Sequence, residues 1–418
     1  MSMEKHADEH NPTHSHHHDS HSHSHPHPHP HSRNHVDPEV NTSRRDFLRV
    51  LMGGALAGAS VLELAYHRAA WARAAAPATE GNLFDLQKVA DGVYFAHAHP
   101  QAMVNCNAAI FVRSKDAVVV DAHSKPSAAA SLIAQIKREV TAKPVRYVIN
   151  THFHWDHTQG NHAYRQANEK VDYIATATTK QLMQDQSLAR LKSSLDDEVP
   201  KQIDALQARA AHSTSAAEKA FCAEQVRQMQ AYQAELKDYT LELPTITFDK
   251  TYLLQDPAFD LHLEFHGRAH TAGDLFVLCP QQRALATGDA VHGWLPNLTD
   301  GFPRLWPGTI DDVARADFKY TLGGHGPLQA DRTVMMNQRN YIEELTEKVE
   351  AGKKAGLTLA ELQQRLTVAS LKSMQSNGYE TFLTRTLAAS NPHFGPMPPL
   401  QHDVNDNIRD VYTNLDRA

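Results

Sequence analysis

A short segment in the middle of the chain constrains the fold most strongly. Residues 151–157, Thr-His-Phe-His-Trp-Asp-His, directly follow the apolar run 145–150, which has the pattern of a buried strand. Side chains two residues apart share one face of an extended segment, so His152 and His154 can reach one ion. A turn then brings Asp156 and His157 to a neighbouring position. The segment therefore predicts a metal site at the end of a buried strand.

Three further ligand residues follow later in the chain, each in a glycine-containing turn. His270 lies in Gly-Arg-Ala-His-Thr-Ala-Gly, Asp289 in Thr-Gly-Asp-Ala and His325 in Gly-Gly-His-Gly-Pro. A single histidine in such a turn is usually structural. Taken together, and each at the end of a strand-like run, the three residues complete a set of seven ligands, which is enough for two ions.

The sequence around these turns alternates between short apolar runs and amphipathic segments. Residues 127–140 have helical periodicity, with Leu132, Ile133 and Ile136 on one face. This rhythm predicts an α/β core in which helices cover sheets. Strands are predicted at 93–96, 108–112, 117–121, 145–150, 171–175, 245–248, 252–254, 261–266, 274–279 and 283–287.

Residues 178–240 interrupt this rhythm. They are rich in Ala, Gln, Lys, Glu and Leu and contain no glycine before residue 240, which predicts two or three helices, roughly 178–196 and 215–236. We interpret this insertion as a structural addition packed on the core. The alternative is that its helices form a wall over the metal site.

The region after His325 is predicted to be helical. Helices are expected at 331–351 and from Leu359, the second with a capping box formed by Thr358 and Glu361. A proline-rich stretch from Asn391 and a last short helix near 404–415 are expected to wrap the surface.

In their order along the chain, these motifs resemble those of the metallo-β-lactamase superfamily over roughly residues 83–329. They are the strand ending at Asp121, the HxHxDH segment, the His-Thr-x-Gly-Asp turn, the Gly-Asp turn and the Gly-His-Gly turn. The resemblance implies an αβ/βα four-layer sandwich of the metallo-β-lactamase type at 83–345, with a helical insertion at about 178–240 and a helical C-terminal extension at 346–418. The site would lie at the edge where the two sheets meet.

The resemblance also implies a role for each ligand. In the family, the residues matching His152, His154 and His270 hold the first zinc ion, those matching Asp156, His157 and His325 hold the second, and the one matching Asp289 bridges both. Zinc is expected because imidazole and carboxylate ligands with open positions are typical of catalytic zinc sites, although iron or manganese occupies the same ligand set in relatives. Two such ions can share a hydroxide, since a bound metal lowers the pKa of water from roughly 16 to about 7.

Asp156 is the candidate catalytic residue, because it could orient this nucleophile and carry its proton. The expected activity is hydrolysis of an ester, thioester, lactone or lactam bond in a small-molecule substrate. Asp289 bears on the choice among these. β-Lactamases of this superfamily commonly carry Cys or Ser there, whereas an aspartate resembles the glyoxalase II, lactonase, sulfatase and phosphodiesterase branches. β-Lactamase activity is therefore a less favoured alternative.

Two alternatives from other functional classes stay open. A mononuclear iron oxygenase of the persulfide dioxygenase type shares much of the motif set. A binding protein could instead store zinc on its N-terminal histidines. Weaker candidates for substrate contacts lie in two loops, where they either line a pocket or pack the loop onto the body: His97, His99, Met103, His292, Trp294, Phe302 and Trp306.

The N-terminal region, residues 1–42, contains 13 of the 29 histidines and almost no apolar residues. Such a segment cannot bury enough surface to offset the entropy of ordering its backbone, and disorder is expected. Dense imidazoles bind zinc, nickel or copper loosely, and a solubilising tract is the alternative interpretation.

Residues 43–76 resemble a twin-arginine signal peptide. Ser-Arg-Arg-Asp-Phe-Leu-Arg at 43–49 precedes an apolar run at 50–64, and Ala-x-Ala sequences at 72–74 and 74–76 offer cleavage sites. The run is shorter than the roughly 20 residues of a spanning helix, so no permanent membrane anchor is expected. The signal implies the Tat export machinery as a partner and a periplasmic or extracellular location.

Charge and cysteine content restrict the partners and the redox chemistry. A net charge of −7 without a basic run argues against a nucleic-acid-binding surface, which needs clustered Lys and Arg. Three cysteines without CxxC spacing provide no pattern for a disulfide framework or a cysteine zinc site. Cys279, in an apolar run, is expected to be a buried strand residue.

Overall fold

The computed structural model describes residues 83–99, 106–390 and 399–417. The chain divides into two units, Met1–Leu64 and Ala65–Ala418, and every described residue belongs to the second. The predicted histidine tract at 1–42 and export signal at 43–76 therefore lie outside the described residues. In the part of the chain that is described, no helix has the length and apolar character needed to cross a membrane.

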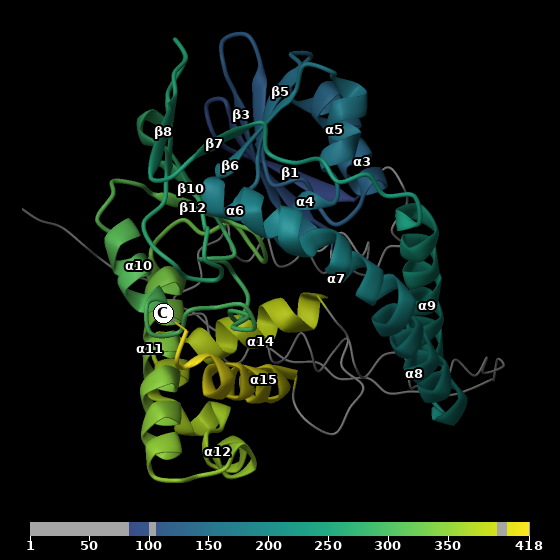
Figure 1. The fold of residues 1–418 in the computed structure, drawn as a ribbon, viewed down its shortest axis with the longest axis vertical. Coiled ribbons are helices and arrows are strands. Elements are labelled where there is room, and N and C mark those ends of the chain that lie inside the picture. The colour runs from purple at the N-terminus through teal and green to yellow at the C-terminus, as the bar shows by residue number, and fades with distance from the viewer. Residues whose placement is uncertain (1–82, 100–105, 391–398, 418) are drawn as a thin grey trace, which may run out of the picture. The chain divides into compact units, whose positions relative to one another are not determined.

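Two β-sheets form the centre of the described part of the second unit (Figure 1). The first has seven strands in sequence order, antiparallel from β1 to β4 and parallel from β4 to β7. They are β1 Phe84–Ala90, β2 Val93–Ala98, β3 Ala108–Val112, β4 Ala117–Val120, β5 Val145–Ile149, β6 Asp172–Thr176 and β7 Ile246–Phe248.

The second sheet has five described strands in the order β12-β11-β10-β9-β8, and only β11 and β12 are parallel among these neighbours. The strands are β8 Thr251–Leu254, β9 Leu261–Glu264, β10 Phe276–Cys279, β11 Ala284–Gly288 and β12 Tyr320–Gly323. Sequence patterns assigned no residue range to β1 or β12, although a strand-like run was expected before His325. The first is only partly buried, and the second is a four-residue strand that ends in glycine.

Strand alternation places the core on both faces of the first sheet. In β4, Val118 and Val120 point into the cluster between the sheets, whereas Ala117 and Val119 point to the opposite side. The inner cluster is completed from the second sheet by residues such as Leu263 and Val277. Full burial of one such aliphatic side chain contributes roughly 1.5–3 kcal/mol, so β4 is stabilised from both sides.

Helices cover the outer faces and complete the four layers. Leu132 of α3 (Pro126–Glu139) and Tyr164 of α5 (Asn161–Ala167) pack on the first sheet. Ile310 of α10 (Trp306–Val313) and Tyr341 of α11 (Thr333–Lys354) pack on the second. The order helix, sheet, sheet, helix confirms the predicted αβ/βα sandwich.

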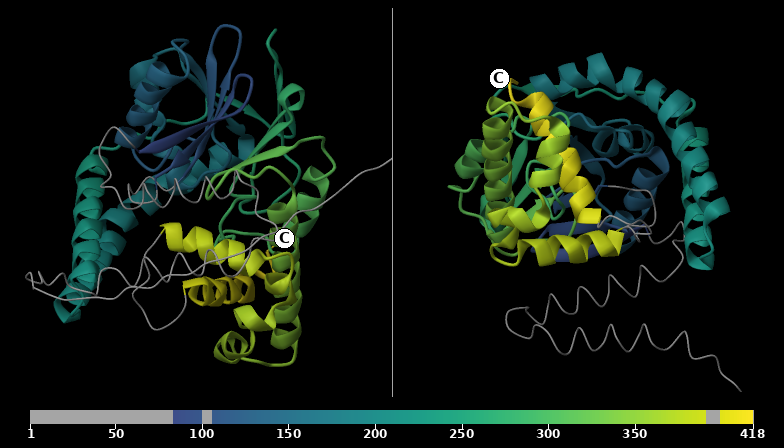
Figure 2. Two further views of the ribbon diagram at one scale, coloured as in Figure 1. Left: turned by 180° about the vertical axis from the view of Figure 1, so that it is seen from behind. Right: turned by 90° about the horizontal axis from the view of Figure 1, so that it is seen from below.

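The insertion is helical, but its first helix is longer than predicted. The helical path runs past residue 196, because Pro200 lies in the first turn of α8, where a missing N–H costs no hydrogen bond. Helices α8 and α9 then pack side by side (Figure 2). The elements are α6 Ala177–Leu182, a π-helical turn at Met183–Ser187, α7 Leu188–Ser193, a second π-helical turn at Ser194–Glu198, α8 Val199–His212 and α9 Ala216–Leu236.

The last helix does not merely wrap the surface, so this expectation was wrong. Val404, Ile408 and Val411 of α15 are fully buried in the same core as α11. The predicted capping box of Thr358 and Glu361 is confirmed. The helices are α12 Leu359–Arg365, α13 Lys372–Gln375, α14 Tyr379–Ser390 and α15 Pro399–Asn414, with short 3₁₀ turns at Pro280–Gln282 and Val368–Ser370.

Strands β9 and β10 are each two residues shorter than predicted, because of local side-chain bonds. Asp274 accepts hydrogen bonds from the backbone N–H and the hydroxyl of Thr271, which keeps residues 271–274 in a turn before β10. Strand β9 ends at Glu264, and His266 beyond it hydrogen-bonds Asp312 of α10. Cys279 is buried in β10 as predicted, and the cysteines of the described chain, Cys106, Cys222 and Cys279, are all unpaired.

Candidate metal centre

The seven predicted ligands come together at one edge of the two sheets. They follow the carboxyl ends of β5, β11 and β12, except for His270, which lies in the connection between β9 and β10. Parallel strands end at the same edge, so β11 and β12 bring Asp289 and His325 together. Two groups result, each with ligand atoms within 4.8 Å of one another: His152, His154 and His270, and Asp156, His157, Asp289 and His325.

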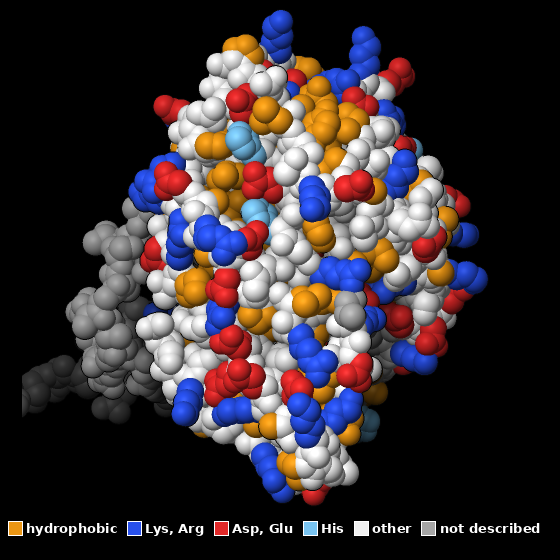
Figure 3. Space-filling view, turned by 60° about the vertical axis from the view of Figure 1, so that its left-hand side comes forward, with side chains coloured by type: hydrophobic (Ala, Val, Ile, Leu, Met, Phe, Trp, Pro, Cys, Tyr) orange, Lys and Arg blue, Asp and Glu red, His pale blue; other side chains and the backbone are white. Residues whose placement is uncertain are grey.

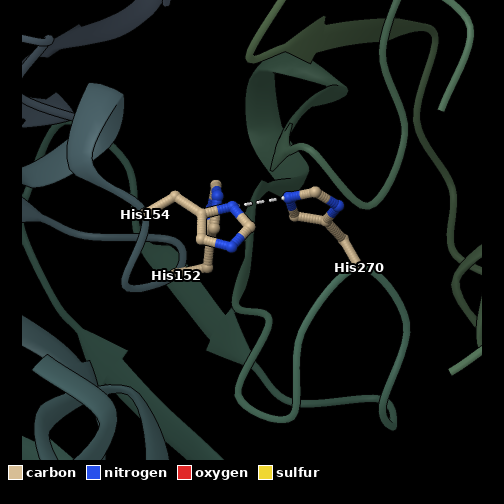
Figure 4. Close-up of side chains that lie close together, drawn as sticks. All are labelled: His152, His154 and His270. Carbon is tan, nitrogen blue, oxygen red and sulfur yellow. Dashed lines mark hydrogen bonds between the residues drawn. The ribbon is translucent and has the colours of Figure 1, made fainter. Parts of the chain in front are cut away.

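In the first group, neighbouring acceptors fix which ring nitrogen carries the hydrogen. His154 donates from Nε2 to Asp300 (2.8 Å) and His270 donates from Nδ1 to the Asn297 carbonyl (3.0 Å). Their other nitrogens, His154 Nδ1 and His270 Nε2, then carry lone pairs and lie 2.9 Å apart (Figure 4). Two lone pairs at this distance repel unless a cation lies between them.

The third histidine of this group completes the arrangement. His152 Nδ1 lies 3.0 Å from the hydroxyl of Thr151, which itself donates to Asp121, so the imidazole donates to the hydroxyl. His152 Nε2 is left buried without a partner. Burial, followed by the neighbouring imidazoles, lowers the pKa of His152 well below its usual value and that of His270 to about 3. These rings are therefore held in the neutral form that binds metal.

In the second group, carboxylates surround the histidines. His157 donates from Nδ1 to Asp121 (2.8 Å), and its buried Nε2 lies 3.4 Å from Asp156 and 3.3 Å from Asp289. His325 Nε2 lies 3.1 Å from Asp289 and 3.3 Å from Asp156. Burial would lower the pKa of His325, but Asp289 and Asp156 outweigh it and raise the pKa to about 9. This group therefore attracts positive charge.

The two groups fit a pair of divalent cations. His152 Nε2, His157 Nε2 and Asp289 Oδ1 are buried polar atoms without a hydrogen-bond partner, and each faces the other ligand atoms. An unpaired polar atom of this kind costs free energy unless something satisfies it. Three imidazoles in one group, and two imidazoles with two carboxylates in the other, are donor sets typical of zinc.

Glycine is required where the backbone approaches these ligands. A Cβ atom on Gly324 would overlap Asp289 and lie 2.8 Å from the His157 ring. Gly288 has a φ of +50°, and a Cβ atom there would overlap the side chain of Thr151. The Gly-Asp and Gly-His turns therefore leave room for the ligands of the neighbouring strand ends.

Sequence reasoning missed the residues that orient the ligands. Asp121 accepts the hydrogen bonds of the Thr151 backbone N–H, the Thr151 hydroxyl and His157. The sequence marked Asp121 as the residue that ends the first motif of the resemblance, but no role was predicted for it. Asp300 and the Asn297 carbonyl lie in a loop with no recognisable pattern.

The candidate substrate contacts divide between the site and the core. Trp294 stacks on the ring of His325, with centroids 4.6 Å apart and an interplanar angle of 13°, and the ring of His292 lies 5.4 Å from that of His325. Phe302 and Trp306 are buried, and Trp306 belongs to the core around α11 while its ring also lies 5.6 Å from that of His270. His97 is half-buried on β2, His99 is buried, and Met103 lies outside the described residues.

The insertion has a small core of its own and also contacts the ligand-bearing segment. Leu191, Ile203, Tyr232 and Leu236 pack together within it. The ring of Tyr232 lies 5.8 Å from that of Trp155, and its hydroxyl donates to Gln159 (2.9 Å). Trp155 is 40% exposed, so an apolar surface remains beside the predicted ligands. The insertion is thus both a structural addition and a neighbour of the site.

Comparison with known proteins identifies the family. Residues 103–333, more than half of the chain, match the sequence model of the metallo-beta-lactamase superfamily, and the chain belongs to this superfamily. Members of this superfamily are typically hydrolytic enzymes that bind metal ions.

Solved structures are similar to this chain at low sequence identity. A metallo-beta-lactamase from Pontibacter korlensis is 18% identical, with 62% of this chain and 99% of that chain covered and a TM-score of 0.45. FIM-1 from Pseudomonas aeruginosa, solved in a mono-zinc form, is 17% identical, with 63% and 97% covered and a TM-score of 0.44. The stereoselective inverting sec-alkylsulfatase Pisa1 from Pseudomonas sp. is 16% identical, with 82% of this chain and 51% of that chain covered and a TM-score of 0.54.

Proposed function

We propose that this protein is a hydrolase that holds two zinc ions and cleaves an ester, thioester, lactone or lactam bond. One observation carries the proposal. The hydrogen bonds around the site leave His152 Nε2, His154 Nδ1, His270 Nε2 and His157 Nε2 as lone-pair donors facing two adjacent positions. Membership of a superfamily of metal-binding hydrolases supports the same function.

Asp289 is the residue suited to join the two positions. Its Oδ1 lies 3.3 Å from His157 Nε2, and its Oδ2 lies 3.1 Å from His325 and 3.6 Å from His270 of the first group. When bound, two zinc ions would supply a hydroxide nucleophile near neutral pH and polarise the oxygen of the scissile group. Asp289 would keep the two cations close together by placing a negative charge between them.

Asp156 is the proposed catalytic residue. Burial would raise its pKa, but His157 and His325 outweigh it and hold the pKa well below the usual value. The carboxylate is therefore ionised at neutral pH and can accept a hydrogen bond from a water molecule. In this role it would orient the attacking oxygen and then carry its proton to the leaving group.

A second candidate reaction is hydrolysis of a sulfate ester. The fold shared with the sec-alkylsulfatase extends over 82% of this chain, beyond the residues that match the family's sequence model.

A β-lactam is the less favoured substrate, because the β-lactamases of this superfamily commonly carry Cys or Ser at the position of Asp289. An iron-dependent oxygenase is the alternative from another reaction class.

Metal analysis and a substrate panel test the proposal. Protein purified without added metal is expected to contain about two zinc ions per chain, whereas a single iron ion would favour the oxygenase. The panel consists of nitrocefin, a lactone, a thioester, a bis-aryl phosphate and a secondary alkyl sulfate. Activity should disappear after treatment with a chelator and return with zinc. Zinc-loaded protein that cleaves none of these bonds would contradict the hydrolase assignment.

We also propose that the Tat machinery exports this protein to the periplasm or beyond. The twin-arginine pattern at 43–49 supports the proposal. Replacing Arg44 and Arg45 with Lys should keep the protein in the cytoplasm, as judged by cell fractionation.

Removing residues 1–42 should leave two tightly held zinc ions. A loss of most of the zinc capacity would favour storage on the histidine tract.

A further inference from the structure

Asp300 connects a predicted zinc ligand to the helical insertion. One of its oxygens lies 2.8 Å from His154 Nε2, and Arg190 of α7 donates to both oxygens at 2.7 and 2.9 Å. The side chain of Asp300 is 14% exposed. Exposed ion pairs usually contribute little to stability. A guanidinium that donates two hydrogen bonds to a mostly buried carboxylate has the geometry of a stronger ion pair.

The orientation of His154 depends on this carboxylate. An ionised carboxylate only accepts hydrogen bonds, so His154 Nε2 must carry the hydrogen and Nδ1 must carry the lone pair. That lone pair is the ligand atom that faces His270 Nε2. If Asp300 moved or lost its charge, the imidazole could rotate or change its tautomer, and one ligand of the first group would be lost.

Arg190 is held against the ligand-bearing segment from a second direction. Its guanidinium lies over the ring of Phe153, 4.9 Å from the centroid, and Phe153 separates His152 from His154 in the sequence. Helix α7 lies between two π-helical turns, Met183–Ser187 and Ser194–Glu198. Such turns occur frequently at functional sites.

The loop that carries Asp300, residues 296–300, is held on another side by α15. Asn414 donates to the carbonyls of Leu298 and Thr299, and Asn407 donates to that of Pro296, all at 2.9 Å. These bonds fix the backbone of the 296–300 loop but do not touch the Asp300 carboxylate. Apart from the hydrogen bond with His154 itself, the two bonds from Arg190 are the ones that hold this carboxylate in place.

We propose that Arg190 is a positioning residue of the metal centre, through which the helical insertion fixes Asp300 and, by way of Asp300, the ligand His154. The insertion would then be part of the zinc site in addition to being its neighbour. This inference rests on the proposed zinc function, and the experiment below separates the failure of one from the failure of the other.

The test measures zinc affinity directly, by competition with a chromophoric chelator. In Arg190→Gln, one of the two zinc ions should bind about 10–100-fold more weakly, the range typical for loss of a group that orients a ligand. Arg190→Lys should give an intermediate loss, because an ammonium keeps the charge without the fork. Arg227→Gln is the matched control, since Arg227 pairs with Glu224 on α9 in the same insertion. It should bind zinc like the wild type.

Two further measurements distinguish positioning from general stabilisation. In an Asp300→Asn background, Arg190→Gln should have no additional effect on zinc affinity, because Arg190 would act only through Asp300. Cobalt substituted for zinc should show an altered visible absorption spectrum in Arg190→Gln and an unaltered one in Arg227→Gln.

Two results would overturn the inference while leaving the proposed function intact. One is wild-type zinc affinity in folded Arg190→Gln or Arg190→Lys protein. The other is an equal loss of zinc affinity when Arg190→Gln is introduced into the wild-type protein and into the Asp300→Asn variant. A wild-type protein that binds no zinc tightly would overturn the proposed function itself.

Discussion

Replacing Asp121 with Asn tests how far the metal centre depends on a residue that binds no metal. Asp121 accepts a hydrogen bond from the Thr151 backbone N–H at 2.9 Å, one from the Thr151 hydroxyl at 2.9 Å and one from His157 Nδ1 at 2.8 Å. Asn has nearly the same shape and tolerates the positive φ of 67° at this position. The substitution therefore changes hydrogen bonding with little added backbone strain.

The magnitude follows from counting donors and acceptors. The amide of Asn offers one oxygen, so its NH₂ group must face either Thr151 or His157, both of which donate in the wild type. Loss of one bond to a charged acceptor costs about 1.5–3 kcal/mol of folding free energy. If the NH₂ group faces His157, the imidazole must accept at Nδ1 and carry its hydrogen on Nε2, the metal-binding atom. The affinity for the zinc ion bound there should fall by about 10–100-fold.

Two assays separate these effects. Denaturant unfolding of zinc-depleted protein measures the folding cost, and chelator competition measures zinc affinity. Asp256→Asn is the control, because Asp256 accepts bonds from the backbone N–H and hydroxyl of Ser114 just as Asp121 does from Thr151, at a site without predicted ligands. The reasoning is refuted if Asp121→Asn binds both ions with wild-type affinity and the zinc-depleted protein unfolds at the same denaturant concentration.

Three other changes should have distinct effects. Asp289→Asn should lower turnover by orders of magnitude and weaken one zinc ion at least about tenfold, because the charge between the ions is lost; kinetics with zinc analysis would show this. Gly324→Ala should push Asp289 out of place and lower zinc affinity, whereas Gly308→Ala, with open space around it, should not. Hydrogen bonds from Lys348 and from the start of α13 outweigh burial and lower the pKa of Glu344 from 4.5 to about 2. Its stabilising effect is therefore complete above pH 4.5 and is lost as the pH falls toward 2, so unfolding of Glu344→Gln should lack that part of the acid dependence.

Local patterns predicted an α/β core, and the resemblance to the superfamily predicted the four-layer sandwich. Strand alternation in 117–121 and 145–150 marked buried strands, and each ligand turn followed such a run or began beside one. The resemblance to the superfamily, which implies a site at the edge where the two sheets meet, predicted that residues 152–157, Asp289 and His325 lie near one another. The physics of strand ends is local, and it is therefore visible in a single sequence.

What the sequence concealed depends on contacts between distant segments. His154 and Asp300 are 146 residues apart, and no sequence pattern around Asp300 predicts its contact with His154. The start of α15 at Pro399 was missed because prolines dominate the preceding residues. Its burial was missed because Val404, Ile408 and Val411 are buried by packing into the same core as α11, which the local sequence does not show.

The bonds from α15 to the 296–300 loop also set an order of events during biosynthesis. A ribosome adds Asn407 and Asn414 after every predicted ligand and after Asp300, so a growing chain presents the ligand histidines before the loop that orients them is anchored. Domains assemble as units once their parts are available. Metal loading at full affinity should therefore follow completion of the polypeptide, and ribosome-bound chains halted before residue 399 should retain zinc poorly even though all seven ligands have been synthesised.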